Sequence, residues 1–342
     1  MIKLLLAVIA LFTGLTVFSQ KDSVRKYLDA ELHFTTKKEM VYPAMAIRME
    51  DHWVLYAVYP DTSILLTAYF KDAALTIKDG PFILYHAKKV KAQSGHFKDN
   101  TANGLWQSWY TNGQLKNEGL IVNNHFSGVW KAWYQNGQMM SERTYYYTDS
   151  LSGTPVHQHS PNYRVEKVLD DFTAEGKLEG PCNTWYENGN KESTVNYHND
   201  SLTGSCTWYR SNGHPSSKEL YVNGKVEELE CYDEEGRLTG STCSILKLPL
   251  FIHPFLSAED YIVDELHKEK NRDIKQEGDA MVNFTVNSNG KIENLTIASS
   301  PDPALSKHIV KIISGMAAWS PAITHNRKID YPVKLIIPYY RN

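Results

Sequence analysis

The sequence predicts a mainly β protein, in which an antiparallel meander of hairpin repeats is followed by a small α+β domain. Three observations support this prediction: an aromatic motif that returns at a fixed spacing, an Asn-Gly pair in most of its copies, and the loss of that period beyond Leu250. The chain has 342 residues, which is enough for two domains or one elongated array.

The first residues have the pattern of a secretory signal peptide. Lys3 is followed by an apolar stretch that extends with few interruptions to Phe18, and Ser19 supplies a small residue at its end. Export and signal cleavage require this order. The stretch is shorter than the about 20 apolar residues that cross a bilayer, although an uncleaved anchor stays an alternative. We predict a signal peptide over residues 1–19.

Charge and hydropathy narrow the classes of partner. The chain has 36 Lys+Arg against 39 Asp+Glu, and no basic run that could neutralise a phosphate backbone, so nucleic acid is not an expected partner. After the signal peptide, no apolar stretch is long enough to span a bilayer. We expect an exported protein that is periplasmic, associated with the outer membrane, or secreted.

The repeat motif reads Gly-x-Trp-x-x-Trp-Tyr-x-Asn-Gly. It starts at Gly104 and returns at Gly128, 24 residues later. A third copy starts at Gly180, a shifted copy at Gly204, and a weaker one precedes them at Gly80. A fixed period of this length is typical of a repeat array.

Each copy is predicted to form a β-hairpin. Aromatic and branched residues favour strands, and Asn-Gly tolerates the positive φ angles of a tight hairpin turn. A single hairpin is marginally stable in water, so stability must come from neighbours along the row. We predict hairpin repeats over residues 80–245, with residues 20–79 either starting the same sheet or capping it.

Side chains alternate between the two faces of a strand, so Trp106 and Tyr110 should point one way and Leu105 and Trp109 the other. Both faces then carry aromatic rings. At least one ladder must be buried or covered, and the other is either core or a binding groove for a peptide or carbohydrate. The candidate contact residues on the repeats are Trp109, Trp133 and Trp185.

The motif resembles the bacterial variant of MORN repeats, over roughly residues 79–243. The resemblance implies an elongated sheet used for protein or surface contacts, and it implies no catalytic residues. The chain departs from the pattern at an insertion over residues 154–171 and at Tyr209, which takes the usual place of a Trp. The ladder is expected to be bent or interrupted there.

Four cysteines lie in the repeats, at Cys182, Cys206, Cys231 and Cys243. An oxidising destination permits disulfides, and the spacings match no usual zinc pattern. Equivalent residues of successive repeats should lie about 9.5 Å apart, which is too far for a bond between Cys182 and Cys206. One disulfide elsewhere and four buried thiols remain as alternatives.

The order helix, hairpin, helix, strand is predicted beyond Leu250. Ser257 can cap a first helix, and residues 280–286 and 292–297 have the alternation of a two-stranded hairpin. Asp302 and a following proline start a second helix. The last strand has Tyr331, Val333, Leu335 and Ile337 on one side.

This order and three local motifs resemble the C-terminal domain of TonB, and we place such a domain over residues 255–342. The motifs are Asn289-Gly290-Lys291-Ile292, Asp302-Pro303-Ala304-Leu305 and Trp319-Ser320-Pro321-Ala322. The resemblance implies a periplasmic domain that binds a segment of an outer-membrane receptor or transporter by strand addition. The candidate edge residues are Tyr331, Val333 and Leu335. The 14 prolines form no spacer tract, which argues against energy transduction.

Motifs typical of hydrolases, metalloproteases and nucleotide-binding proteins do not occur in the sequence. His157 and His159 could begin a metal site, but two histidines alone leave it under-coordinated. We therefore predict no catalytic residue, no cofactor and no metal.

The predicted function is that of a non-catalytic binding or scaffolding protein of the cell envelope. The repeat sheet would contact a protein or surface ligand, and the C-terminal domain would dock a partner's extended strand. Two alternatives are an envelope hydrolase with an unrecognised site, and an antitoxin-like or purely structural repeat protein. Export argues against a cytosolic antitoxin.

Overall fold

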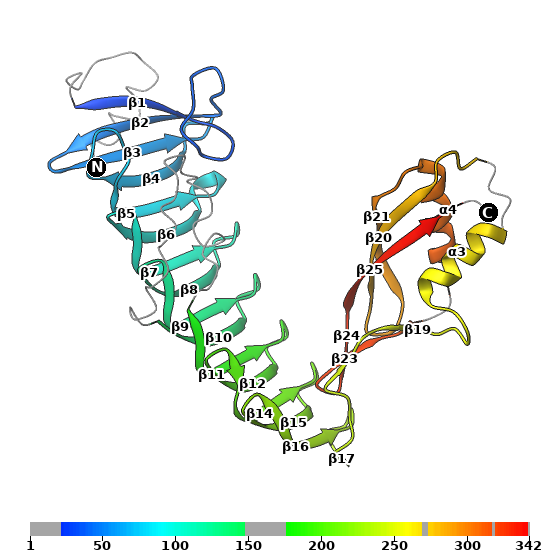
Figure 1. The fold of residues 1–342 in the computed structure, drawn as a ribbon. Helices are drawn as coiled ribbons and strands as arrows, with labels where there is room; N and C mark the ends of the chain where they lie inside the picture. The colour runs from blue at the N-terminus through cyan, green and yellow to red at the C-terminus, as the bar shows by residue number, and fades with distance from the viewer. Residues whose placement is uncertain (1–21, 148–175, 269–272, 317–318, 341–342) are drawn as a thin grey trace. The chain divides into compact units, whose positions relative to one another are not determined.

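The computed structural model describes residues 22–147, 176–268, 273–316 and 319–340 (Figure 1). The predicted signal peptide over residues 1–19 lies outside this part of the chain, as do His157 and His159. The chain divides into two units. The first consists of Met1–Cys206, Ser211–Gly213 and Leu220–Glu227, and the second of Thr207–Arg210, His214–Glu219 and Glu228–Asn342.

A sheet of 17 strands accounts for most of the described chain (Figure 1). Wherever the register is defined, each strand pairs antiparallel with its neighbour in sequence, which confirms the predicted meander. The first four strands belong to the same sheet, so residues 23–70 contribute its beginning. The strands are β1 (Ser23–Leu28), β2 (Tyr42–Met49), β3 (His52–Val58), β4 (Ile64–Phe70), β5 (Lys78–Tyr85), β6 (Lys91–Lys98), β7 (Thr101–Trp109), β8 (Leu115–Val122), β9 (His125–Trp133), β10 (Met139–Tyr146), β11 (Lys177–Trp185), β12 (Lys191–His198), β13 (Ser201–Leu202), β14 (Gly204–Tyr209), β15 (Pro215–Val222), β16 (Lys225–Tyr232) and β17 (Leu238–Gly240), with a 3-10 helix at Ala87–Lys89.

The first tryptophan of the motif packs against a glycine of the preceding strand. Trp106 is fully buried over Gly95, and Trp130 lies over Gly119 in the same way. A Cβ atom at Gly119 would lie 2.2 Å from a ring carbon of Trp130. In the repeat that follows, Cys182 takes the place of the tryptophan. The ring and the missing side chain therefore form a matched pair in the first two copies.

The hairpin turns are joined by a one-way ladder of hydrogen bonds. The Tyr110 hydroxyl donates to the carbonyl of Trp133, and the Tyr134 hydroxyl donates to the carbonyl of Trp185, both at 2.8 Å. The first rung spans 23 residues of sequence and the second spans 51, because the insertion lies between its ends. This hydrogen bond is kept across the insertion because β10 pairs with β11, with a register shift between Arg143 and Tyr145. The expected bend or interruption of the aromatic ladder stays a prediction.

Lys78 is a buried lysine in β5, with its ammonium 4.9 Å from the centre of the Phe97 ring. Burial lowers its pKa to about 8. An unfolded lysine has a pKa of about 10.4, so between these values the unfolded chain binds more protons than the folded one. The free energy of unfolding should therefore rise with pH, by about 3 kcal/mol over this window.

Urea unfolding at pH 7.5 and 10.5 checks this prediction, with Lys78→Met as the matched variant because it keeps the chain length without the charge. The variant should lack the part of the pH-dependent rise in the free energy of unfolding that Lys78 contributes. An equal rise in both proteins would contradict the assignment to Lys78.

The second unit contains the C-terminal domain, and it confirms the predicted order of helix, hairpin, helix and strand. The structure adds a small hairpin between the second helix and the last strand. The elements are β18 (Leu246–Lys247), β19 (Leu250–Phe251), α3 (Ala258–Lys268), β20 (Gly278–Val286), β21 (Ile292–Ser299), α4 (Pro303–Ser314), β22 (Trp319–Ser320), β23 (Ala322–Thr324), β24 (Arg327–Ile329) and β25 (Tyr331–Tyr339).

Both helices begin at the predicted capping residues. The Ser257 hydroxyl accepts the N–H of Asp260, and the Asp302 carboxylate accepts the N–H of Ala304. Asp302 also accepts the N–H groups of Lys275 and Gln276. These backbone donors, Lys275 foremost, lower the pKa of Asp302. The start of α4 is thereby tied to the chain that leads into β20.

The core of this domain lies between the two helices and one face of the sheet. Ile262 and Leu266 of α3 and Leu305 and Ile309 of α4 are fully buried, together with Val282 of β20. These are the apolar positions that recur at helical and strand spacing in the sequence. Among the described residues, no helix covers the opposite face of the three-stranded sheet.

One disulfide forms between Cys231 and Cys243, with the Cα atoms 5.8 Å apart. Cys182 and Cys206 are buried and are not joined by a disulfide, as expected from the strand spacing. The disulfide joins the last long repeat strand, β16, to the chain that follows the three-residue strand β17.

Candidate partner-binding site

The last strand, β25, lies at an open edge of the C-terminal sheet. The strand order of this sheet is β21-β20-β25, so within the described residues β25 has a strand neighbour on one side only. Its nine residues pair with β20 without a register shift, from Tyr331 opposite Val286 to Tyr339 opposite Gly278. A long, regular edge strand is a template for another strand.

Two prolines define which backbone groups of β25 face outward. In an antiparallel pair, the N–H and C=O groups of alternate residues point to the same side. Pro332 and Pro338 lack an N–H, so they fit only where the nitrogen faces away from β20. Lys334 and Ile336 share their parity. The open edge therefore presents two N–H groups, from Lys334 and Ile336, between two prolines.

The other edge strand, β21, is less suited to strand addition. Its register with β20 shifts twice, and Asn294 adopts a positive φ of 54°. A bulge of this kind twists an edge and interrupts the row of groups that a second strand would use. Of the two edges, β25 is the one that can accept an extended segment over several residues.

The predicted edge residues lie on β25, with side chains on the covered side of the sheet. Leu335 is 5% exposed, and Tyr331 and Val333 are half-buried. The alternate side chains lie on the uncovered face, where Ile336 is 53% exposed and stands opposite Met281 of β20. The role of Tyr331, Val333 and Leu335 in binding stays a prediction. A partner at this edge would meet the side chains of Lys334 and Ile336.

The predicted repeat residues occupy equivalent places at the ends of three strands. Trp109, Trp133 and Trp185 are half-buried. The Lys91 ammonium lies 5.4 Å from the Trp109 ring, and Lys191 lies 5.8 Å from Trp185. The three tryptophans belong to the first unit, whereas β25 belongs to the second.

A buried polar cluster in the second unit was missed in the sequence. The Glu219 carboxylate lies 2.9 Å from Nδ1 of His325, 106 residues away in the chain, and accepts a hydrogen bond from the Ser217 hydroxyl. The three residue types are those of hydrolase triads, but the Ser217 hydroxyl donates to the carboxylate and not to the imidazole. A nucleophile needs its base within hydrogen-bond reach. This arrangement therefore suits a structural role.

Neither a metal site nor a membrane-spanning helix is found in the described residues. They contain no cluster of three or more His, Cys, Asp or Glu side chains suited to a metal ion. Their helices are too short or too polar to cross a bilayer.

The fold and the open edge define a β-hairpin repeat protein that carries a small α+β domain. Residues 102–123, 126–145 and 178–199 match the MORN repeat variant, and residues 269–340 match the C-terminal domain of the Gram-negative bacterial TonB protein. Three segments of the chain are thus similar to MORN-variant repeats, and its C-terminal part is similar to a TonB C-terminal domain. Both are binding-type domains, and they indicate a protein-binding role in the cell envelope. No curated protein matches the chain.

Proposed function

We propose that this chain is an exported, non-catalytic binding protein of the cell envelope, which docks an extended segment of a partner protein at the open edge of β25. The observation that carries the proposal is the uninterrupted pairing of β25 with β20 and its lack of a second neighbour in the described sheet. Main-chain hydrogen bonds supply affinity in such strand addition, and side chains on alternate positions supply specificity.

The edge of β25 favours a short partner segment. Pro332 and Pro338 limit the outward donors to the N–H groups of Lys334 and Ile336. The exposed side chains beside them combine a positive charge with an apolar surface. A partner segment with an acidic residue facing Lys334 and an apolar one facing Ile336 and Met281 fits this edge. An outer-membrane receptor or transporter is the class of partner that we propose.

The repeat sheet is proposed to hold a second protein or a surface ligand. Trp109, Trp133 and Trp185 recur at the same place in successive hairpins, so one extended ligand could meet the same kind of contact three times. Two of these rings have a lysine ammonium beside them. This pattern favours a ligand that carries negative charge along its length.

Site-specific photo-cross-linking in the living cell tests the docking proposal. A photoreactive phenylalanine analogue replaces Ile336 on the edge strand, and in a control it replaces Val310, which is also exposed but lies on α4. We expect position 336 to give a discrete adduct that maps to an extended segment of an envelope protein, and position 310 to give none. Identical adducts from both positions, or none from position 336, would count against docking at this edge.

A further inference from the structure

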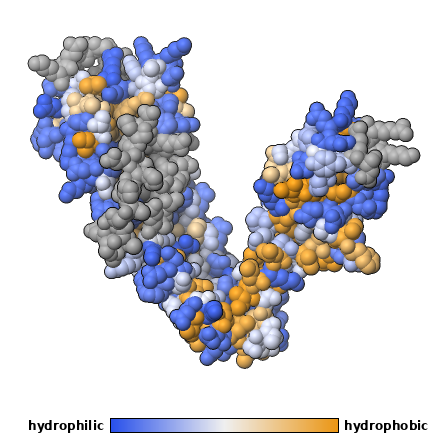
Figure 2. All heavy atoms as spheres, in the orientation of Figure 1, coloured by the Kyte–Doolittle hydropathy of each residue, from blue (hydrophilic) through white to orange (hydrophobic). Residues whose placement is uncertain are grey.

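The chain between the repeats and the C-terminal domain has little buried apolar surface. We define the strap as residues 238–250, which include β17, β18 and the first residue of β19. Leu238, Leu246, Leu248 and Leu250 are each more than half exposed, at 63%, 70%, 56% and 60%. Figure 2 shows hydrophobic residues at the surface over β18 and β19. Since burial is the main force that holds a segment to its domain, the strap needs another source of order.

The disulfide is the strongest restraint on the strap. Cys243 lies in its middle and is bonded to Cys231 of β16, which is 2% exposed and therefore fixed in the sheet. The other restraints are few. The Thr239 hydroxyl donates to the carbonyl of Cys231, and β17 pairs with β16 at two positions. Without the covalent bond, these contacts and the short pairings of β18 with β23 and of β19 with β22 would have to order the segment.

Directly after Cys243, the strap covers the small hairpin of β23 and β24. The carbonyls of Ile245 and Ser244 accept the N–H groups of His325 and Asn326 at 2.7 and 2.9 Å. Leu246 and Lys247 then pair with β23, so β18 occupies one edge of this strand. The strap is thus the third strand of a sheet whose other two strands form the hairpin.

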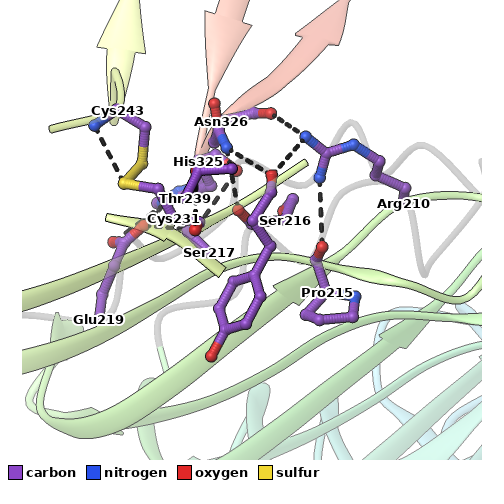
Figure 3. The surroundings of a disulfide bond; sticks show 11 residues. Arg210, Pro215, Ser216, Ser217, Glu219, Cys231, Thr239, Cys243, His325 and Asn326 are labelled. Atoms are coloured by element: carbon purple, nitrogen blue, oxygen red, sulfur yellow. Dashed lines mark hydrogen bonds and ion pairs between the residues drawn. A yellow bond between two sulfur atoms is a disulfide. The ribbon is translucent and has the colours of Figure 1, made fainter. Parts of the chain in front are cut away.

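The turn of this hairpin is held independently on its other side (Figure 3). The Asn326 amide donates to the carbonyls of Ser216 and Tyr232, and the His325 ring stacks on Trp208 at 3.7 Å. The Arg210 guanidinium donates to the carbonyl of Asn326. Because these contacts do not involve the strap, the hairpin can stay in place when the strap leaves.

We propose that the strap is a redox-controlled cover, which the Cys231–Cys243 disulfide keeps closed over the edge of β23. A dithiol reductant opens it by thiol–disulfide exchange: its two thiols become a disulfide, and the protein disulfide becomes two cysteine thiols. Cys243 is half-buried whereas Cys231 is buried, so attack falls on the Cys243 sulfur. Release of the strap uncovers a short second strand edge, on β23.

Hydrogen exchange measured by mass spectrometry on the full chain tests this inference. The oxidised protein is compared with the same protein treated with dithiothreitol after folding, and with the variant Cys231→Ser/Cys243→Ser. We expect exchange of the amides of residues 244–247 and 323–326 to become at least tenfold faster in both comparisons. The amides of β20 and β25 should keep their rates. The variant Cys182→Ser/Cys206→Ser, which keeps the disulfide, should respond to dithiothreitol as the wild type does.

Two results would overturn the proposal. If exchange in residues 244–247 is unchanged by reduction, the disulfide does not hold the strap. If β20, β25 and α4 accelerate together with the strap, the disulfide stabilises the whole unit and is not a local latch. The wild-type sample reduced after folding decides between these outcomes even when the double-serine variant does not fold.

Discussion

Replacing Lys334 with proline is expected to reduce partner capture at β25 by tenfold or more. Position 334 has the same parity as Pro332 and Pro338, so the substitution removes an N–H that faces the open edge and spares the bonds to β20. A partner carbonyl that loses its donor on binding costs about 1–3 kcal/mol, and about 1.4 kcal/mol corresponds to a tenfold loss of affinity. Only two outward N–H groups are available, so the loss of one is large.

The yield of the cross-link from position 336 measures this effect. Lys334→Ala is the matched control, because it removes the same charge and side chain but keeps the N–H. We expect Lys334→Ala to retain most of the yield, and both variants to unfold within a few degrees of the parent. Equal losses in the two variants would assign recognition to the lysine side chain and reject main-chain pairing at this residue.

Replacing Gly119 with alanine is expected to destabilise the repeat sheet by about 3 kcal/mol. The added Cβ would lie 2.2–2.5 Å from three ring carbons of Trp130, and the ring is held by a hydrogen bond from its Nε1 to the carbonyl of Leu120 at 2.9 Å. Phe126 packs against the ring, 4.0 Å between centroids, which limits its movement. Neither the backbone nor the ring can therefore move away at low cost.

A double-mutant cycle with Trp130→Leu separates this clash from a general effect of alanine on the strand. Chemical denaturation should show that Gly119→Ala costs much less in the Trp130→Leu background than in the wild type. Strictly additive effects would show that the fit between ring and glycine is not the cause.

The repeated hairpins were predictable because each copy contains the same local sequence pattern. Strand alternation around Trp106 and the Asn-Gly turn act over fewer than ten residues, and the fixed spacing then stacks the copies. The helices of the C-terminal domain were predictable for a similar reason, since Ser257 and Asp302 are local capping signals. Local patterns of this kind predict an element correctly when the element is long enough to show its period.

The hairpin of β23 and β24 and the disulfide were not predictable in the same way. Strands of three residues are too short to show a period, and the contact of Glu219 with His325 joins distant parts of the sequence. The choice of Cys231 and Cys243 depends on where β17 ends. One signal was present and unused: Pro332 and Pro338 lie six residues apart, which gives them the same parity on a strand.

The ladder of the hairpin turns makes the repeat array modular. Two successive hairpins are joined to the next by the same hydrogen bond, from the Tyr110 hydroxyl to the carbonyl of Trp133 and from the Tyr134 hydroxyl to the carbonyl of Trp185. If a hairpin is duplicated or deleted, its neighbours can therefore form the same hydrogen bond with each other. The array can change its length by whole repeats without a new type of contact. The hydrogen bond from Tyr134 to Trp185 spans 51 residues of sequence, so extra sequence can be inserted between two hairpins without loss of the bond that joins them. Such a repeat array can evolve a different length or an inserted segment while its strand pairing stays the same.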